Sequence, residues 1–154
     1  MNICRPLKLL TWVYAVLIAA LAVANPVFAG ANDIRFIAEL SDNEQSSPTY
    51  SPAKGLAEVV LERETLKLTW TVTYKDLSSP PTEAGFYGPE NVGATSGMLI
   101  NIGEDGMNSP MKGSAIISDG ELQYLINERI YVNIKSKKWP DGEIRGQLQR
   151  QPPH

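Results

Sequence analysis

Hydrophobic and polar residues alternate along several short segments of the chain. The clearest case is residues 66–75, where leucine, tryptophan, valine and tyrosine are separated by threonine and lysine. Successive side chains of a β-strand point to opposite faces, so such a segment buries one face and exposes the other. The same period recurs in residues 34–40, 98–102, 130–134 and 144–148. Turn residues separate these segments, and the pattern therefore predicts an all-β fold, an antiparallel β-sandwich or barrel.

One segment, residues 118–127, departs from this period. Ser118 is followed three residues later by Glu121, the pattern of a capping box, in which each side chain binds a backbone N–H at the start of a helix. Three apolar residues then have the spacing of one helical face: Leu122, Leu125 and Ile126. The sequence therefore predicts one short helix between two strands.

The first residues have the pattern of a signal peptide. Arg5 and Lys8 form a positively charged start, an uncharged apolar run follows, and small residues end the segment. We expect residues 1–29 to be removed by cleavage after Ala29, or alternatively after Ala31. The apolar run is shorter than the roughly 20 residues of a membrane-spanning helix, so an uncleaved anchor is the less favoured alternative. The protein is therefore expected to be exported, to the periplasm or outside the cell.

Cleavage changes the composition of what remains. The net charge moves from −3 to −5 and Cys4, the only cysteine, is lost, so neither a disulfide nor a catalytic thiolate is available. The remainder suffices for one core and is too short for two domains. We expect one domain at residues 33–149, with a long loop at residues 41–54. The chain is expected to be frayed from Gln149, the last residue of the domain, and residues 150–154 are expected to form a flexible tail outside it. The mildly acidic composition argues against a nucleic-acid partner.

The last two alternating segments carry a recognisable motif. Residues 131–135 read Tyr-Val-Asn-Ile-Lys, and residues 139–148 read Trp-Pro-Asp-Gly-Glu-Ile-Arg-Gly-Gln-Leu, which indicates two strands joined by a Pro-Asp-Gly turn. Earlier pieces are a Leu-Ser step at 40–41, a Leu-Ser-Ser-Pro turn at 77–80 and a strand closing in Gly-Pro at 88–89. In these pieces the chain from 33 to 149 resembles the chordin (CHRD) domain family.

The resemblance implies a β-sandwich of immunoglobulin-like or Greek-key type on an exported protein. It implies no particular activity, because members that consist of this domain alone share no established one. Family members commonly carry a His-x-His pair and a further histidine where this chain has Gly85, Tyr87 and Lys135. Three such histidines could bind a transition metal, by analogy with copper-zinc superoxide dismutases. Here the only histidine is His154, and the cationic Lys135 would repel a metal. We therefore expect no bound metal, no cofactor and no catalytic residue.

Three further residues of the predicted hairpin are candidate contacts. Glu143 and Arg145 stand two apart on one strand, where they could bind a polar ligand as a carboxylate–guanidinium pair; a structural pair that fixes strand register is the favoured interpretation. Trp139 lies beside Lys137 and Lys138, and with Lys135 they form a basic, aromatic hairpin edge. Such an edge could contact an anionic glycan or a membrane headgroup, although lysines on edge strands more often prevent aggregation.

Together these observations favour a non-catalytic interaction or structural module of the envelope or extracellular space, with a protein or glycan partner and no stable membrane span after signal cleavage. One alternative is a metal-binding, redox or hydrolytic protein; glycoside hydrolysis would need two of Glu39, Glu83 and Glu143 about 5 to 10 Å apart. The other is a carrier of a small anionic ligand, anchored by Lys135 in the space vacated by the missing histidines. The candidate contact residues are Gly85, Tyr87, Lys135, Trp139, Glu143 and Arg145.

Overall fold

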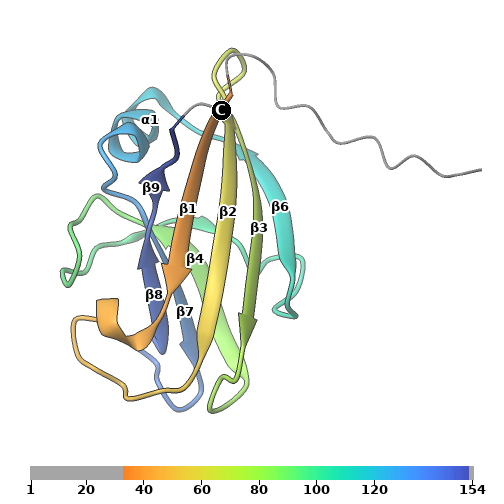
Figure 1. Cartoon of the computed structure of the whole chain (residues 1–154). Helices are drawn as coiled ribbons and strands as arrows, with labels where there is room; N and C mark the ends of the chain where they lie inside the picture. The colour runs from red at the N-terminus through yellow and green to blue at the C-terminus, as the bar shows by residue number, and fades with distance from the viewer. Residues whose placement is uncertain (1–32, 153–154) are drawn as a thin grey trace, which may run out of the picture.

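Two antiparallel β-sheets pack face to face in the computed structural model, which describes residues 33–152 (Figure 1). The predicted signal peptide lies outside the described residues. The first sheet contains β1 (Ile34–Leu40), β2 (Lys54–Glu62), β3 (Lys67–Lys75), β6 (Met111–Ile116) and β9 (Gln149–Arg150), and the second contains β4 (Pro81–Tyr87), β5 (Met98–Asn101), β7 (Tyr131–Ser136) and β8 (Ile144–Gln147). The all-β prediction is confirmed, and the arrangement is a sandwich, not a closed barrel.

The strand order shows how the chain moves between the sheets. It is β6-β3-β2-β1-β9 in the first sheet and β5-β4-β7-β8 in the second. Along the chain, β4 and β5 belong to the second sheet, and β6 then returns to the first sheet beside β3. The next strand, β7, lies in the second sheet beside β4. This is Greek-key connectivity, in which a strand returns beside an earlier one after an excursion. It brings β4 and β7, which are far apart in the sequence, into direct pairing.

The alternating pattern correctly identifies the face of β3 that is buried. Leu68, Trp70 and Val72 are buried, while the lysines and threonines between them face outward. Trp70 reaches across the interior to Phe86 of β4, with their ring centroids 5.4 Å apart and their planes at 83°, an edge-to-face contact. The core is therefore formed by the inward faces of both sheets, as period-two alternation requires.

The predicted helix is confirmed as α1 (Asp119–Ile126), between β6 and β7. The hydroxyl of Ser118 accepts a hydrogen bond from the backbone N–H of Glu121 at 3.3 Å, and the Glu121 carboxylate accepts one from the backbone N–H of Ser118 at 2.7 Å. These two bonds are the expected capping box. Leu125 is fully buried and anchors the helix to the core.

The prediction that the chain is frayed from Gln149 onward is wrong for the first two residues of the tail. Gln149 and Arg150 form β9, which pairs with Ile37 and Phe36 of β1. The N–H of Gln151 also bonds to a carbonyl of β1, at 2.8 Å. The free edge of β1 provides the hydrogen-bond partners that hold this segment. The expected long loop contains a short 3-10 turn, η1 (Asp42–Glu44).

The two lateral sides of the sandwich differ. On one side β1 and β8 approach closely, because backbone hydrogen bonds of 2.9 Å in both directions join Ser41 to Arg145. Gly146 of β8 allows this approach, since a Cβ there would lie 2.4 Å from the carbonyl oxygen of Glu39. On the other side β5 and β6 are each the last strand of their sheet. The sandwich is therefore closed on one side and open on the other.

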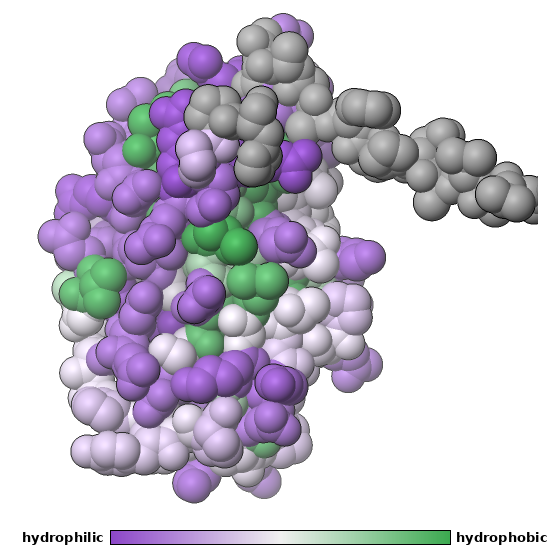
Figure 2. Space-filling view, in the orientation of Figure 1, coloured by the Kyte–Doolittle hydropathy of each residue, from purple (hydrophilic) through white to green (hydrophobic). Residues whose placement is uncertain are grey.

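The outward face of the first sheet is mostly polar and carries an apolar band in its middle (Figure 2). Partly exposed Ile37 of β1 and Leu56 and Val60 of β2 stand at outward positions of these strands. Charged residues and the threonines of β3 surround them. Within residues 33–152, the structure contains no helix long and apolar enough to cross a membrane.

Candidate binding site on the outer face of the second sheet

The pairing of β4 with β7 brings together the three positions where the family resemblance implies histidines. Glu83 stands opposite Lys135, and Gly85 stands opposite Asn133. Alternate residues of a strand share a face, so Gly85, Tyr87 and Lys135 all belong to the outer face of the second sheet. The expectation that residues 85 and 87 share a face with a third position nearby is confirmed.

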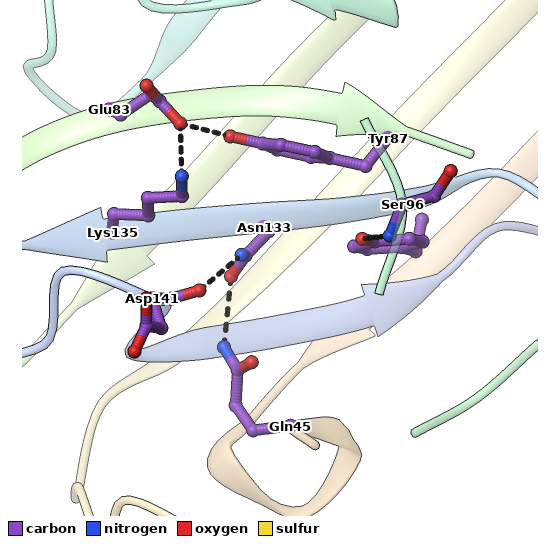
Figure 3. Close-up of polar contacts among 8 residues, drawn as sticks. Gln45, Glu83, Tyr87, Ser96, Asn133, Lys135 and Asp141 are labelled. Atoms are coloured by element: carbon purple, nitrogen blue, oxygen red, sulfur yellow. Dashed lines mark hydrogen bonds and ion pairs between the residues drawn. The ribbon is translucent and has the colours of Figure 1, made fainter. Parts of the chain in front are cut away.

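Lys135, Glu83 and Tyr87 form a connected polar group on this face (Figure 3). The ammonium of Lys135 lies 2.6 Å from Oε1 of Glu83, and the hydroxyl of Tyr87 donates a hydrogen bond to the same oxygen. The hydrogen bonds from Lys135 and Tyr87 lower the pKa of Glu83, so its carboxylate is ionised near neutral pH. The positive charge of Lys135 is therefore compensated within the protein.

Burial raises the pKa of Tyr87, and its hydrogen bond to the Glu83 carboxylate raises it further. An ionised phenol would face an adjacent carboxylate in a poorly solvated position, and both effects disfavour it. Tyr87 therefore remains neutral and serves as a hydrogen-bond donor.

A stack of side chains crosses three strands beside this group. The rings of Tyr87 and Tyr131 are stacked, with centroids 5.5 Å apart and 17° between their planes. The guanidinium carbon of Arg145 lies 3.5 Å from the centroid of the Tyr131 ring, a close cation–π contact. The hydroxyl of Tyr131 accepts a hydrogen bond from the backbone N–H of Ser96 at 3.0 Å. The floor of the site is therefore closely packed.

The space expected at Gly85 is not available. A Cβ at this position would lie 2.9 Å from the carbonyl oxygen of Ile100 and 3.0 Å from Cε of Met98. The neighbouring strand β5 and its Met98 side chain fill the volume that a larger residue would occupy. Gly85 therefore permits close packing of β5, and the vacated space that would form a ligand site there is filled.

A cavity of about 460 Å³ lies over the remaining part of this face. Its floor includes Tyr87, Tyr131, Asn133 and Lys135. Three segments form its walls, namely the loop residues 45–49, residues 95–96 and the hairpin residues 139–142. The volume is within the range of small-ligand sites in proteins. Tyr87, Lys135 and Trp139 of the predicted contacts line the cavity, whereas Gly85, Glu143 and Arg145 do not.

Asn133 joins two of these walls (Figure 3). Its side-chain oxygen accepts a hydrogen bond from Nε2 of Gln45 at 2.9 Å, and its side-chain nitrogen donates to the carbonyl of Asp141 at 3.1 Å. Gly142 is required beside it, because its φ is +141° and a Cβ would lie 2.4 Å from the Asn133 side chain. The shape of the cavity therefore depends on contacts between residues about 90 positions apart.

The predicted pairing of Glu143 with Arg145 is wrong. Glu143 is fully buried, and its Oε1 accepts hydrogen bonds from the hydroxyls of Ser51 and Ser78, both at 2.6 Å, and from the N–H of Ser78 at 2.7 Å. Burial acts to raise the pKa of Glu143, but the nearby Ser136 hydroxyl and the hydrogen bonds from Ser51 and Ser78 outweigh it and lower the pKa. Glu143 thus ties the 41–54 loop and the β3–β4 turn to the hairpin beneath the cavity wall.

Arg145 has a corresponding role under the opposite wall. It is 1% exposed, and its Nη1 and Nη2 donate to the carbonyls of Ala94 and Asn91 at 2.5 and 2.9 Å. Burial lowers the pKa of Arg145, while the charges of Glu44 and Glu90 act in the opposite direction. Arg145 therefore positions the loop that carries residues 95–96 of the cavity wall.

The family model of the CHRD domain matches residues 36–148, which is most of the chain. The chain belongs to the CHRD domain family. CHRD domains are typically extracellular. Among curated proteins and among solved structures, no match to the chain is found.

In this CHRD domain the basic residues of the hairpin do not form a strand edge. Lys135 belongs to β7, which lies between β4 and β8, so its predicted role in protecting an edge strand is wrong. Trp139 lines the cavity, and its Nε1 donates to the hydroxyl of Ser78 at 3.2 Å. Lys138 lies over the Trp139 ring, 5.4 Å from its centroid.

The three carboxylates considered for hydrolysis do not meet in the CHRD domain. Glu39 is exposed on β1 of the first sheet, Glu143 is buried, and Glu83 is bonded to Lys135 and Tyr87. None of them lines the cavity. Among residues 33–152, no group of three or more histidine, cysteine, aspartate or glutamate residues has an arrangement that could hold a metal ion.

Proposed function

We propose that this CHRD protein is an exported, non-catalytic binding module that holds a neutral carbohydrate chain in the cavity on the second sheet. The observation that carries the proposal is the chemistry of the lining. Serine, threonine and amide side chains supply nearly half of the lining residues: Gln45, Ser46, Ser47, Thr49, Thr95, Ser96 and Asn133. The side chains of Gln45, Thr49, Ser96 and Asn133 already bond within the protein. The hydroxyls of Ser46, Ser47 and Thr95, with the remaining acceptor capacity of the others, match a ligand that carries many hydroxyls.

Trp139 adds a partly exposed aromatic surface beside these polar groups. An indole ring offers an apolar face of fixed geometry at little conformational cost. The apolar C–H faces of a sugar ring fit against such a surface while its hydroxyls bind the amides and hydroxyls around it. Polar and apolar contacts on opposite sides of one ligand favour a carbohydrate over a purely apolar small molecule.

The charges at the cavity favour a neutral ligand over an anionic one. Lys135 is engaged by Glu83 at 2.6 Å, and the carboxylate-bearing Asp141 also lines the cavity. Because Glu83 already neutralises the ammonium, an anionic ligand would meet little net positive charge at Lys135 and would lie near the Glu83 carboxylate. The pair therefore argues against the small-anion carrier with Lys135 as its anchor.

Two observations support a non-catalytic and exported role. Neither Glu83 nor Glu143 lines the cavity, and both carboxylates are engaged by hydrogen-bond donors of the protein itself. Export is supported by the signal-peptide pattern of residues 1–29 and by the typically extracellular character of CHRD domains.

The direct test is a comparison of neutral and anionic oligosaccharides on a glycan array, followed by calorimetric titration of those retained. We expect retention of neutral oligosaccharides, and loss of this binding in Trp139→Ala because the aromatic surface is removed. The matched control is Lys137→Ala, an exposed residue of the same hairpin that does not line the cavity. It should bind as the unaltered protein does.

Exclusive retention of anionic sugars, or equal binding by Trp139→Ala and the unaltered protein, would refute the assignment of the cavity to a neutral glycan. Stoichiometric copper or zinc in the purified protein, bound by residues of the domain, would contradict the non-catalytic role.

A further inference from the structure

The open side of the sandwich contains a groove of about 370 Å³ that shares no residue with the cavity described above. The groove is lined by β5 with the residue that follows it and by Lys112 to Ile116 of β6. Each of these strands is the last in its sheet among residues 33–152. Two unpaired strand edges therefore border one groove, a situation that proteins usually avoid by covering or charging the edge.

The backbone of β6 has hydrogen-bonding groups directed toward this open side. The N–H of Ile117 bonds to the carbonyl of Leu66 at 2.9 Å, next to the register that pairs β3 with β6. Antiparallel pairs alternate between bonded and non-bonded positions, so Gly113 and Ala115 bond to β3. By the same alternation, Lys112, Ser114 and Ile116 direct their N–H and C=O groups away from the sheet.

The side chains at the groove also include a donor without an acceptor. Trp70 is 6% exposed and lines the groove, and among residues 33–152 its Nε1 has no hydrogen-bond partner. The indole lies against Gly113, where a Cβ would be 3.2 Å from Nε1. A buried N–H without an acceptor costs about 1–3 kcal/mol. A ligand carbonyl in the groove would relieve this cost.

The lining has a mixed apolar and acidic character. Leu99, Ile100 and Ile102 give it apolar surface, and Ile116 of β6 is 68% exposed at its border. Three acidic residues and one basic residue complete the lining: Glu104, Asp105, Glu121 and Lys112. An occupant with apolar side chains and positive charge complements this groove.

We propose that the groove binds an extended basic peptide segment of a partner protein, which adds to the free edge of β6 as a further strand. Its backbone pairs with Lys112, Ser114 and Ile116, and one of its carbonyls accepts the N–H of Trp70 Nε1. Its apolar side chains alternate into the groove, and its net positive charge complements the acidic character that Glu104 and Asp105 give to the lining. Backbone pairing supplies affinity and the alternate side chains supply specificity, as in other cases of strand addition.

The test uses the purified protein and an acetylated, amidated hexapeptide of alternating lysine and valine. Titration followed by NMR is expected to show saturable binding, with the Nε1–H resonance of Trp70 moving downfield as it gains an acceptor. The Nε1–H of Trp139 already donates to Ser78 and serves as the internal control that does not move. The same peptide with glutamate in place of lysine should not bind.

Two changes separate strand addition from adhesion of a basic peptide. Ser114→Pro removes an N–H on the free edge, which an edge strand tolerates, and should weaken binding about tenfold or more because paired backbone bonds are lost. Ser114→Ala keeps that N–H and should bind normally. Methylation of the peptide's own backbone nitrogens should abolish binding to the unaltered protein, a result that does not depend on how the proline variant folds.

No binding of the lysine–valine peptide, or binding that survives both methylation and Ser114→Pro, would overturn the proposal. A concentration-dependent dimer that forms through β6 and leaves the peptide unbound would also overturn it, because the edge would then belong to a second copy of the chain.

Discussion

Lys135 of β7 forms an ion pair with Glu83, its direct partner across the β4–β7 pairing, with 2.6 Å between Nζ and Oε1. Their side chains are 25% and 41% exposed, so water screens the interaction and its contribution to stability is small. Its effect is on charge, because the ammonium is neutralised beside the cavity. A position that could have attracted anions is thereby made close to neutral.

Replacing Lys135 with methionine should therefore change stability little. We expect the free energy of unfolding to fall by at most about 1 kcal/mol, the usual limit for an exposed pair. Urea denaturation of Lys135→Met, Glu83→Gln and the double variant gives the coupling energy directly. A coupling well above that limit would show that the pair is a main stabilising element.

The same variant should change how Glu83 titrates. Because Lys135 and Tyr87 lower the pKa of Glu83, the contribution of this group to stability is present above its unfolded pKa and is lost as the pH falls through the lower folded value. In Lys135→Met the largest cause of the lowering is removed, so the pKa of Glu83 should return toward its ordinary value of 4.5. NMR titration of the labelled carboxyl measures this, and an unchanged pKa would contradict the assigned cause.

Glu143→Gln should be strongly destabilising although the shape of the side chain is conserved. The amide cannot accept three donors from Ser51 and Ser78 as the carboxylate oxygen does, and we expect a loss of about 2–4 kcal/mol. Since the folded pKa of Glu143 is lowered, the stability that it supplies disappears as the pH falls below its unfolded pKa. The variant should therefore show a flatter acid limb than the unaltered protein.

Glu39→Gln is the matched control for Glu143→Gln, because Glu39 is exposed on β1. It should stay within about 0.5 kcal/mol of the unaltered protein. Equal unfolding midpoints for the two variants in urea would show that the buried carboxylate does not hold the loops together.

Arg145→Lys should loosen the loop that forms one cavity wall. A lysine has no guanidinium plane to stack on Tyr131 and no fixed fork with which to donate to two carbonyls. The bonds to Asn91 and Ala94 are therefore lost or weakened. Hydrogen exchange at the amide of Ser96 should become faster, and the free energy of unfolding should fall by about 1–3 kcal/mol. Arg63→Lys, in the exposed β2–β3 turn, should change neither quantity.

Gly146→Ala tests the closed side of the sandwich. Its Cβ would lie 2.4 Å from the carbonyl oxygen of Glu39, so β1 and β8 would have to separate, and we expect a loss of about 1–3 kcal/mol or more. Gly97→Ala is the comparison, because nothing lies within 4 Å of a Cβ at that position. It should be neutral or slightly stabilising. Thermal unfolding of the two variants gives the ranking, and equal midpoints would refute the close contact.

The elements found from the sequence are those with large apolar residues at regular spacing. Apolar and polar residues alternate strongly around Trp70, and the Ser118–Glu121 capping box marks the start of the helix. Both β3 and α1 could therefore be predicted from the sequence. In contrast, β6 was missed because Gly113, Ser114 and Ala115 have little hydrophobic contrast. The two-residue β9 has no pattern of its own and forms only because β1 offers an open edge.

Only part of the candidate site could be predicted from the sequence. The spacing of residues 85 and 87 and the position of Lys135 in the hairpin indicate one shared face, which strand pairing then produces. The burial of Glu143 and Arg145 could not be predicted, since charged residues are usually exposed and their partners lie 51 to 92 residues away. The walls of the cavity come from separate loops, whose meeting depends on tertiary packing and leaves no local signal.

The pairing of β1 with residues near the other end of the domain has a consequence for how the polypeptide matures. β1 pairs with β2, which follows it closely in the sequence. Its second edge can pair only when Gln149 and Arg150 are present, and its backbone bonds to the other sheet form only when Arg145 is present. Contacts between such distant residues form late. A chain that stops short of Ile144 can make neither contact, so β1 keeps a free edge and lacks its link to the second sheet.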